Sequence, residues 1–319
     1  FVENLYKFIL AKKNSFIFES VEKGTIRGRY TIIGYNPDKI YDIKNKKIIE
    51  KNFKSKKIIK KDVLKYLNEL LNNFKVKSLK TLPRMSSMLV GYFSYDIIRL
   101  IEKIPDKCKN DIDIPDIRLI RPRNLVIYDN VKKKIFFLRN VFKDEGINDY
   151  REEYEKIKKE FNELRFFGTI RLPSNFHKNR KKTKVKSNIT KSKFKKIVNK
   201  AKSYIKKGDI FQVVLSQRFE VNIEKPPLEI YNKLRILNPS PFMFYFNFGD
   251  FQILGSSPEI LVRLINGDVT IRPIAGTRPR GANKIQDKKF TSELLKDPKE
   301  LAEHLMLLDL GRNDVGKVS

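Results

Sequence analysis

The spacing of apolar residues along the chain predicts amphipathic helices and short strands in mixed order. Apolar side chains recur three and four residues apart in three segments, which we expect to be helices: 62–74, 150–164 and 191–207. Two more helices are expected at 227–237 and from residue 297 onward. Alternating or continuous apolar runs predict strands at 15–20, 29–34, 210–219, 238–248, 251–254, 259–263 and 269–272, and a hairpin at 124–142.

Turn residues join several of these strands. Asn266-Gly267 is among the most specific short-range hairpin signals, because both residues tolerate the backbone conformation that a two-residue turn requires. Gly249-Asp250 and Asp129-Asn130 lie at the expected turns of two other hairpins. Many strands joined by tight turns, together with several helices, favour an α+β fold over a doubly wound one. We therefore predict antiparallel β-sheets with helices packed outside them.

Length and composition limit the domain organisation. A chain of 319 residues is long enough for about two domains. Residues 173–192 are rich in Lys, Arg, Asn and Ser, which is typical of a solvated connector. We place a boundary near residue 180, between domains at 1–175 and 185–319. The single cysteine, Cys108, excludes an intramolecular disulfide and favours a reducing compartment such as the cytoplasm.

The chain carries a net charge of +31. A basic excess of this size is typical of proteins that bind nucleic acids. The lysines, however, are spread over the whole chain rather than gathered in one patch. The densest block, residues 178–196, carries no RNP, zinc-finger or helix-turn-helix signature. We therefore interpret the lysine excess as a compositional bias and expect neither a nucleic-acid partner nor a membrane span, since no apolar run approaches ~18 residues.

The richest candidate chemistry is a loop followed closely by a helix. Residues 272–281 read RPIAGTRPRG, an expected strand end that leads into a glycine-containing loop with three arginines. Residues 297–314 read DPKELAEHLMLLDLGRND, with Asp297 at the N-cap position and Pro298 at the first helical position. A backbone-rich anion site beside two carboxylates can hold an anionic substrate through a divalent metal ion.

The polar residues of this helix have plainer interpretations as well. Glu300 is a natural capping-box partner for Asp297. Glu303 has no capping role and would otherwise be a solvated surface charge. Glu300, Glu303 and His304 share one face, because they are three and four residues apart. His304 is left open as a metal ligand, a base or a hydrogen-bonded interior residue.

These two motifs, in this order, closely resemble those of the chorismate-utilising enzymes, above all the anthranilate synthase component I family. Two upstream segments strengthen the resemblance, GDIFQVVLSQRF at 208–219 and NPSPFMFYF at 238–246. The segment GYFSYD at 91–96 is similar to a GYxxYD motif of the same family. The resemblance covers nearly the whole chain from about residue 16, and it is most specific in the second half.

The resemblance assigns roles residue by residue. Gly276 and Thr277 would contact chorismate, although alone they indicate an ordinary β-turn. Glu259 would lie in the active site as a catalytic residue, and Glu300 and Glu303 would hold Mg²⁺. A feedback site for L-tryptophan would use the residues that match the family's motifs: Glu19, Ser20, Pro241, Phe242 and Met243.

The implied reaction converts chorismate and ammonia to anthranilate and pyruvate, the first committed step of tryptophan biosynthesis. Mg²⁺ would hold a chorismate carboxylate, ammonia would add to the ring as the C4 hydroxyl leaves, and pyruvate would be eliminated. Ammonia would come from a separate glutamine amidotransferase subunit, component II, in a heterotetramer, because the sequence has no Cys/His glutaminase motif. We expect the protein to be cytoplasmic.

The nearest alternative is aminodeoxychorismate synthase component I of the folate pathway. That enzyme commonly has PIKGT, whose lysine attacks the substrate, where this chain has Ala275. Isochorismate and salicylate synthases use a lysine to activate water, where this chain has Gln212. Both differences favour ammonia as the nucleophile.

The resemblance also implies that the sequence is incomplete. It starts with Phe1, without a recognisable signal peptide. Family members continue for roughly a hundred residues or more beyond the position of Ser319, with a catalytic histidine and a second pair of metal-binding glutamates. We therefore expect the chain on its own to be inactive.

Overall fold

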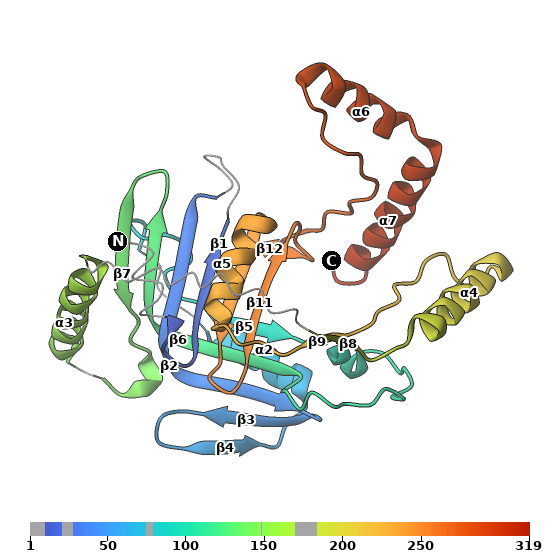
Figure 1. The fold of residues 1–319 in the computed structure, drawn as a ribbon. Coiled ribbons are helices and arrows are strands. Elements are labelled where there is room, and N and C mark those ends of the chain that lie inside the picture. The colour runs from blue at the N-terminus through green and yellow to red at the C-terminus, as the bar shows by residue number, and fades with distance from the viewer. Residues whose placement is uncertain (1–9, 21–27, 75–78, 148, 170–183) are drawn as a thin grey trace.

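The computed structural model describes residues 10–20, 28–74, 79–147, 149–169 and 184–319. Its centre is an antiparallel sheet of nine strands within the described residues (Figure 1). The sheet strands are β1 (Ser15–Glu19), β2 (Tyr30–Lys44), β3 (Lys47–Lys51), β4 (Lys56–Ile59), β5 (Val90–Phe93), β6 (Ile117–Asp129), β7 (Lys134–Arg139), β10 (Phe242–Asn247) and β11 (Gln252–Ser257). Two small hairpin-like sheets pair β8 (Val185–Ser187) with β9 (Phe219–Val221) and β12 (Arg263–Ile265) with β13 (Asp268–Thr270).

The sheet is organised by its two longest strands, β2 and β6. They pair from Tyr30↔Asp129 to Ile43↔Ile117, with a register shift between Pro37 and Lys39. On its other edge β2 carries β1 at one end and β3 at the other. Strand β6 likewise carries β7 at one end and β5 at the other. The β2–β6 ladder therefore supports every other strand of the sheet, directly or through one or two intervening strands.

The helices differ in how closely they lie to this sheet. They are α2 (Val63–Asn73), α3 (Tyr150–Thr169), α4 (Lys191–Lys207), α5 (Pro227–Leu237), α6 (Lys284–Lys296) and α7 (Pro298–Gly316), with short 3₁₀ turns at Tyr95–Leu100 and Lys143–Glu145. Helix α3 packs on β7, and α5 packs on β10 and β11. Helices α4, α6 and α7 stand away from the sheet (Figure 1).

Both faces of the sheet carry a hydrophobic core. On one face Ile17, Val126 and Met243 pack with Leu164 of α3 and Tyr231 of α5. The opposite face is rich in phenylalanine, and its buried members are Phe16, Val90, Ile120, Leu125, Ile127, Phe246 and Phe248. A third cluster lies under α2, where Val63 and Tyr66 meet strands β2, β3 and β6.

Buried ion pairs cross-link the strands. Arg118 of β6 donates to Asp42 of β2 (Nε–Oδ1, 2.6 Å) and to Asp250 in the β10–β11 turn (Nη1–Oδ1, 2.7 Å). Its guanidinium also lies 4.9 Å from the ring centroid of Phe251. These hydrogen bonds raise the pKa of Arg118 against the opposing effect of its burial, which is the largest single influence on it. A buried charge is tolerated when such partners satisfy it.

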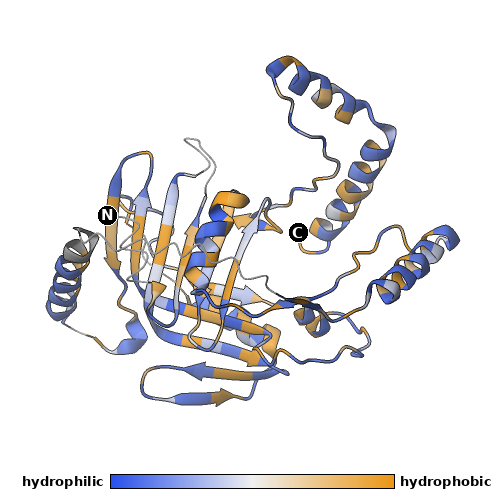
Figure 2. Ribbon diagram, viewed as in Figure 1, coloured by the Kyte–Doolittle hydropathy of each residue, from blue (hydrophilic) through white to orange (hydrophobic). Residues whose placement is uncertain are grey.

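The second half exposes many large apolar side chains. Phe211 is 86%, Val214 87% and Leu261 92% exposed. In Figure 2, apolar residues of α4, α6 and α7 are interspersed with polar ones on helices that lie apart from the sheet. Among the helices of the described ranges, none is long and apolar enough to cross a bilayer.

The predicted α+β class with antiparallel strands is confirmed. The helices expected at 62–74, 150–164, 191–207 and 227–237 are present as α2, α3, α4 and α5. The Asn266-Gly267 turn forms with positive φ at both residues, 53° and 90°. The division into two domains stays a prediction, because the proposed boundary at residue 180 lies outside the described residues. Strand β10, from the second half, nevertheless pairs with β1 of the first, and β11 pairs with β10.

Several strand predictions were wrong. The strand expected at 210–219 is extended without a partner strand among the described residues, and only Phe219–Val221 pairs, with β8 inside the predicted connector. An alternating pattern forms a strand only where a neighbour accepts its backbone hydrogen bonds. The strands at 259–263 and 269–272 are reduced to Arg263–Ile265 and Asp268–Thr270. The β3–β4 hairpin and α6 had no counterpart in the sequence prediction.

Replacing Gly91 with alanine should destabilise the sheet. An added Cβ would lie 1.8 Å from the carbonyl oxygen of Arg118, in the paired strand β6, so a backbone must move. We expect Gly91→Ala to lower the free energy of unfolding by at least about 2 kcal/mol, measured by urea denaturation. Gly316→Ala is the control, because nothing lies within 4 Å of its Cβ position. Equal stability of the two variants would contradict the close β5–β6 approach.

The ion pair between Arg29 and Asp129 should stop stabilising the fold at low pH. Hydrogen bonds from Arg29, followed by backbone N–H groups of Lys132 and Val131, lower the pKa of Asp129 to about 2. A carboxyl whose pKa is depressed by folding stabilises the protein above its unfolded pKa of about 4, and this stabilisation is lost as the pH falls toward the folded value. The difference in free energy of unfolding between wild type and Asp129→Asn should therefore shrink from pH 4 to pH 2. A difference in free energy of unfolding that stays constant from pH 4 to pH 2 would contradict the lowered pKa of Asp129.

Candidate active site

The loop at residues 276–278 and the first turn of α7 are joined by one arginine. Arg278 donates from Nη1 to Glu300 Oε1 at 2.9 Å and from Nη2 to Asp297 Oδ2 at 2.5 Å. The two motifs that the sequence singled out are therefore in direct contact. Hydrogen bonding to Glu300, ahead of that to Asp297, raises the pKa of the Arg278 guanidinium.

The start of α7 is built as its sequence predicts. Asp297 is the N-cap, and its carboxylate accepts from the backbone N–H of Lys299 at 3.0 Å and of Glu300 at 3.3 Å. These backbone hydrogen bonds, with that of Glu300 the strongest influence, lower the pKa of Asp297. The other half of the capping box does not form, because the backbone N–H of Asp297 donates to Leu294 and Glu300 binds Arg278 instead.

Gly276 has a specific structural reason to be glycine. Its φ of 79° lies in the left-handed region, where side chains are strained. A Cβ there would also lie 2.8 Å from Glu300 Oε2 and 3.0 Å from Leu294 Cδ1. The next residue, Thr277, is exposed, and its carbonyl oxygen accepts from Arg278 Nη1 at 2.9 Å. The loop backbone thus approaches the Glu300 carboxylate closely, with a threonine beside it open to solvent.

Glu303 and His304 lie one turn further along α7. Both are partly buried, and neither side chain makes a hydrogen bond or ion pair within the described part of the chain. Glu303 therefore has no structural partner there, whereas Glu300 has one. In those same residues no group of three or more His, Cys, Asp or Glu side chains is placed to hold a metal ion. Of the two carboxylates in the first turns of α7, Glu300 is thus already paired and Glu303, as far as the described residues go, is not.

Glu259 is not brought to this loop by any contact among the described residues. It is exposed, in the bend that follows β11, and its carbonyl oxygen accepts from the Ser257 hydroxyl at 3.0 Å. Its carboxylate makes no hydrogen bond or ion pair in the described ranges. The catalytic role that the family resemblance implies for Glu259 stays a prediction.

The residues of the expected feedback site do gather in one place. Glu19, at the end of β1, pairs with Met243 of β10 in the strand register. Ser20 follows Glu19, and its hydroxyl oxygen is buried without a hydrogen-bond partner. Pro241 and Phe242 lead into β10 beside them, with Met243 1% exposed and Phe242 44% exposed. The antiparallel β1–β10 pairing thus unites two segments more than 200 residues apart in sequence.

Two residues at this cluster were missed by the sequence prediction. Tyr231 donates its hydroxyl to Glu19 Oε1 at 2.5 Å, and Arg235 donates from Nη2 to Glu19 Oε2 at 2.9 Å. Both lie on α5, one helical turn apart, so they share a face. Their four-residue spacing was visible in the sequence, but nothing there indicated that this face of α5 would meet β1.

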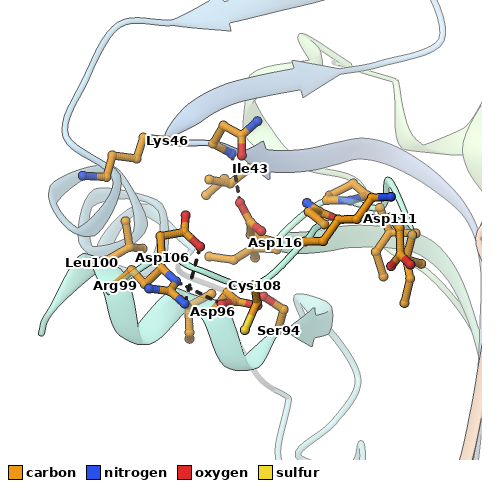
Figure 3. Close-up of a pocket in the computed structure, with 18 of the residues that line it drawn as sticks. Ile43, Lys46, Ser94, Asp96, Arg99, Leu100, Asp106, Cys108, Asp111 and Asp116 are labelled. Atoms are coloured by element: carbon orange, nitrogen blue, oxygen red, sulfur yellow. Dashed lines mark hydrogen bonds and ion pairs between the residues drawn. The ribbon is translucent and has the colours of Figure 1, made fainter. Parts of the chain in front are cut away.

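A cavity of about 470 Å³ lies elsewhere, between the 3₁₀ turn that starts at Tyr95, the segment 105–117 and Arg218 (Figure 3). Its charged side chains are largely occupied with one another, as in the pair of Asp96 with Arg99 at 3.0 Å. Arg218 donates to Asp111 at 2.7 Å, and this hydrogen bond is the main cause that lowers the pKa of Asp111 to about 2. No predicted site residue lines this cavity.

The chain is similar to known proteins over nearly its whole length. The family model for chorismate binding enzymes matches residues 13–319. The chain is 41% identical to anthranilate synthase component 1 of Acetivibrio thermocellus over 99% of its length, and 40% identical to that of Cereibacter sphaeroides over 100%. In both cases it spans 65% of the relative.

Solved structures agree with the fold. The crystal structure of anthranilate synthase component I from Streptococcus pneumoniae TIGR4 is 33% identical, with a TM-score of 0.78 over 91% of this chain and 62% of that one. A putative isochorismate synthase of Bacillus anthracis, 17% identical, shares the fold at a TM-score of 0.51. On the near-complete match to the family model and the extent of these identities, the chain belongs to the chorismate binding enzyme family.

Proposed function

We propose that the chain is the synthase component of an anthranilate synthase, which converts chorismate and ammonia to anthranilate and pyruvate. The observation that carries this proposal is the contact of the loop at 276–278 with the first turn of α7 through Arg278. The loop offers backbone N–H groups and the hydroxyl of Thr277, and the helix offers two carboxylates. Such a set of groups can bind a dicarboxylate substrate with the help of a divalent cation. The names of the relatives support the same reaction.

The residue before Gly276 supports ammonia as the nucleophile. Ala275 lies in the loop that would face the substrate, and its methyl group can form no covalent bond with the ring. Gln212 likewise cannot take a proton from water. A free amine supplied from outside the chain is then the natural nucleophile, and a glutamine amidotransferase component II would supply it within a heterotetramer in the cytoplasm.

The carboxylates of α7 fit a magnesium site of the kind that the reaction needs. Mg²⁺ prefers oxygen ligands and is usually bound by one or two carboxylates, with water and substrate oxygens completing its shell. Glu303 has no competing partner among the described residues, and Glu300 has one oxygen committed to Arg278. We propose that these two glutamates hold Mg²⁺, which when bound would neutralise charge on the substrate.

The rest of the chemistry would be positioning by the chain itself. Gly276 lets the loop backbone approach the substrate, and Thr277 can donate a hydrogen bond to a substrate oxygen. Holding the ring in one orientation lowers the barrier for attack at one carbon, because the entropy of alignment is already lost on binding. Glu259 is our proposal for a further active-site residue.

Regulation by L-tryptophan is proposed at the cluster around Glu19. The buried Ser20 hydroxyl lacks a partner, and the exposed ring of Phe242 can pack against an aromatic ligand. Glu19, which Tyr231 and Arg235 hold in place, lies beside both of these groups. A ligand there would contact β1 and β10 together, and so influence the α5 segment that packs on β10.

Replacing Gly276 with alanine should reduce anthranilate formation more than its effect on stability explains. Alanine at this position would be strained at φ 79° and would also press on Glu300 Oε2. We expect at least about a 100-fold loss of kcat/KM, the effect of a misplacement of about 1 Å in an oriented site. Anthranilate fluorescence measures it, with chorismate, Mg²⁺ and ammonium, in the chain completed to the length of its relatives.

Gly267→Ala is the matched control for this variant. Gly267 has a φ of 90°, so alanine is strained there too, but nothing lies within 4 Å of its Cβ position. Both variants should lose about 1 kcal/mol of stability from the left-handed backbone, and Gly276→Ala should lose more because its Cβ also meets Glu300. If both kept wild-type activity, or lost it equally, the loop at Gly276 would have no special part in catalysis.

The two glutamates of α7 should respond differently to neutralisation. Glu303→Gln is expected to weaken Mg²⁺ binding and abolish activity without change in the fold, because Glu303 has no structural partner in the described residues. Glu300→Gln should weaken Mg²⁺ binding and also loosen the loop, because it loses the ion pair with Arg278. Titration of each variant with Mg²⁺ by calorimetry, with circular dichroism as the folding control, tests both. Unchanged Mg²⁺ affinity in Glu303→Gln would remove it from the site.

A further inference from the structure

The guanidinium of Arg278 donates hydrogen bonds to three different residues. Its guanidinium reaches the carbonyl oxygen of Thr277, the carboxylate of Glu300 and the carboxylate of the N-cap Asp297. Its side chain is 25% exposed, so these contacts are only partly screened by water. Arginine is suited to this role, because its planar fork can satisfy several acceptors in fixed directions, which lysine cannot do.

This arrangement distinguishes the two oxygens of Glu300. Oε1 accepts from Arg278, while Oε2 lies on the side of Gly276, 2.8 Å from where a Cβ would be. The carboxylate therefore cannot rotate freely without losing its hydrogen bond. Its second oxygen is directed to the loop that carries Gly276 and Thr277.

The same contacts restrain the loop. Arg278 follows Gly276 and Thr277 directly, and its side chain is anchored to the N-cap and the first turn of α7. Movement of α7 relative to the loop would break both ion pairs at once. The geometry thus couples the position of the loop to that of the helix.

We propose that Arg278 is a positioning residue that holds one oxygen of Glu300 so that the other is presented to Mg²⁺ beside the substrate loop. This rests on the proposed function, in which Glu300 and Glu303 hold Mg²⁺ and Gly276 and Thr277 contact chorismate. In this proposal Arg278 acts through Glu300 and does not itself bind the metal ion or the substrate. Outer residues that orient a metal-binding carboxylate often matter nearly as much as the ligand itself.

A purely electrostatic role for Arg278 and a positioning role predict opposite changes in Mg²⁺ affinity when Arg278 is removed. If Arg278 merely competed with Mg²⁺ for Glu300, its removal would free a carboxylate and delete a nearby positive charge, so Mg²⁺ would bind more tightly. If it positions Glu300, its removal leaves that carboxylate free to rotate and repelled by Asp297, and Mg²⁺ binds more weakly. The direction of the change therefore separates the two roles.

The experiment compares Arg278→Gln, Arg278→Lys and Arg280→Gln in the chain completed to the length of its relatives. Arg280 is the control, because it lies two residues away, is 89% exposed and pairs only with Asp287 among the described residues. Calorimetric titration with MgCl₂ gives the Kd, and steady-state assays give KM for chorismate and kcat. We expect Arg278→Gln to weaken Mg²⁺ binding by about 10- to 100-fold, Arg278→Lys to recover part of it, and Arg280→Gln to resemble wild type.

A double-mutant cycle identifies the residue through which Arg278 acts. In a Glu300→Gln background, Arg278→Gln should add little further loss of Mg²⁺ affinity, because the carboxylate it orients is gone. Helicity by circular dichroism checks that α7 remains folded, and Asp297→Asn, which keeps a capping side chain but removes the charge, is a second variant. It should weaken Mg²⁺ binding less than Arg278→Gln does.

Two results would overturn the positioning role. One is that Arg278→Gln binds Mg²⁺ as tightly as wild type or more tightly, while Glu300→Gln and Glu303→Gln no longer bind it. The proposed metal site would then stand without a role for Arg278. The other is full additivity of Arg278→Gln and Glu300→Gln. If neither glutamate variant affected Mg²⁺ binding, the proposed metal site itself would fail, and that outcome is distinct from both.

Discussion

The pairing of β2 with β6 is the interaction on which the rest of the fold depends. These two strands are hydrogen-bonded along most of their length, and each carries other strands on its outer edge. Because β1 is held by β2, β10 can pair with β1, and α5 can pack on β10 and β11. The proposed tryptophan cluster at Glu19 thus depends on the β2–β6 pairing, although no residue of β2 or β6 belongs to the cluster. Buried ion pairs such as Arg118 with Asp42 secure the same two strands.

The candidate active site depends on a smaller and more local constraint. Helix α7 lies apart from the sheet, so the position of its glutamates is set by what it contacts nearby. Arg278 supplies that contact, and Gly276 allows it by leaving room for Glu300. Gly311 lets α7 pack in a second place, because a Cβ there would lie 2.3 Å from Ile271 Cδ1. Glycines in the loop and in the helix thus allow the close packing that brings the Glu300 carboxylate to the loop backbone.

Sequence patterns predicted the parts of this structure that local chemistry decides. The N-cap at Asp297 and the Asn266-Gly267 turn both follow from residues adjacent in sequence. The role of Arg278 could not be predicted, since it depends on an acceptor 22 residues away. The failed strand at 210–219 has the same cause, because a strand is defined by its neighbour and not by its own alternation. The family resemblance named Glu300 and Glu303, but not the partner that only Glu300 has.

The central proposal is that the chain, completed to the length of its relatives, supports attack of ammonia on chorismate to give anthranilate. Its most direct test is to supply chorismate, Mg²⁺ and ¹⁵N-labelled ammonium to the chain completed to the length of its relatives, and to identify the product by mass spectrometry. We expect labelled anthranilate with an equal amount of pyruvate. Accumulation of labelled aminodeoxychorismate without pyruvate, or of isochorismate without label, would contradict the account.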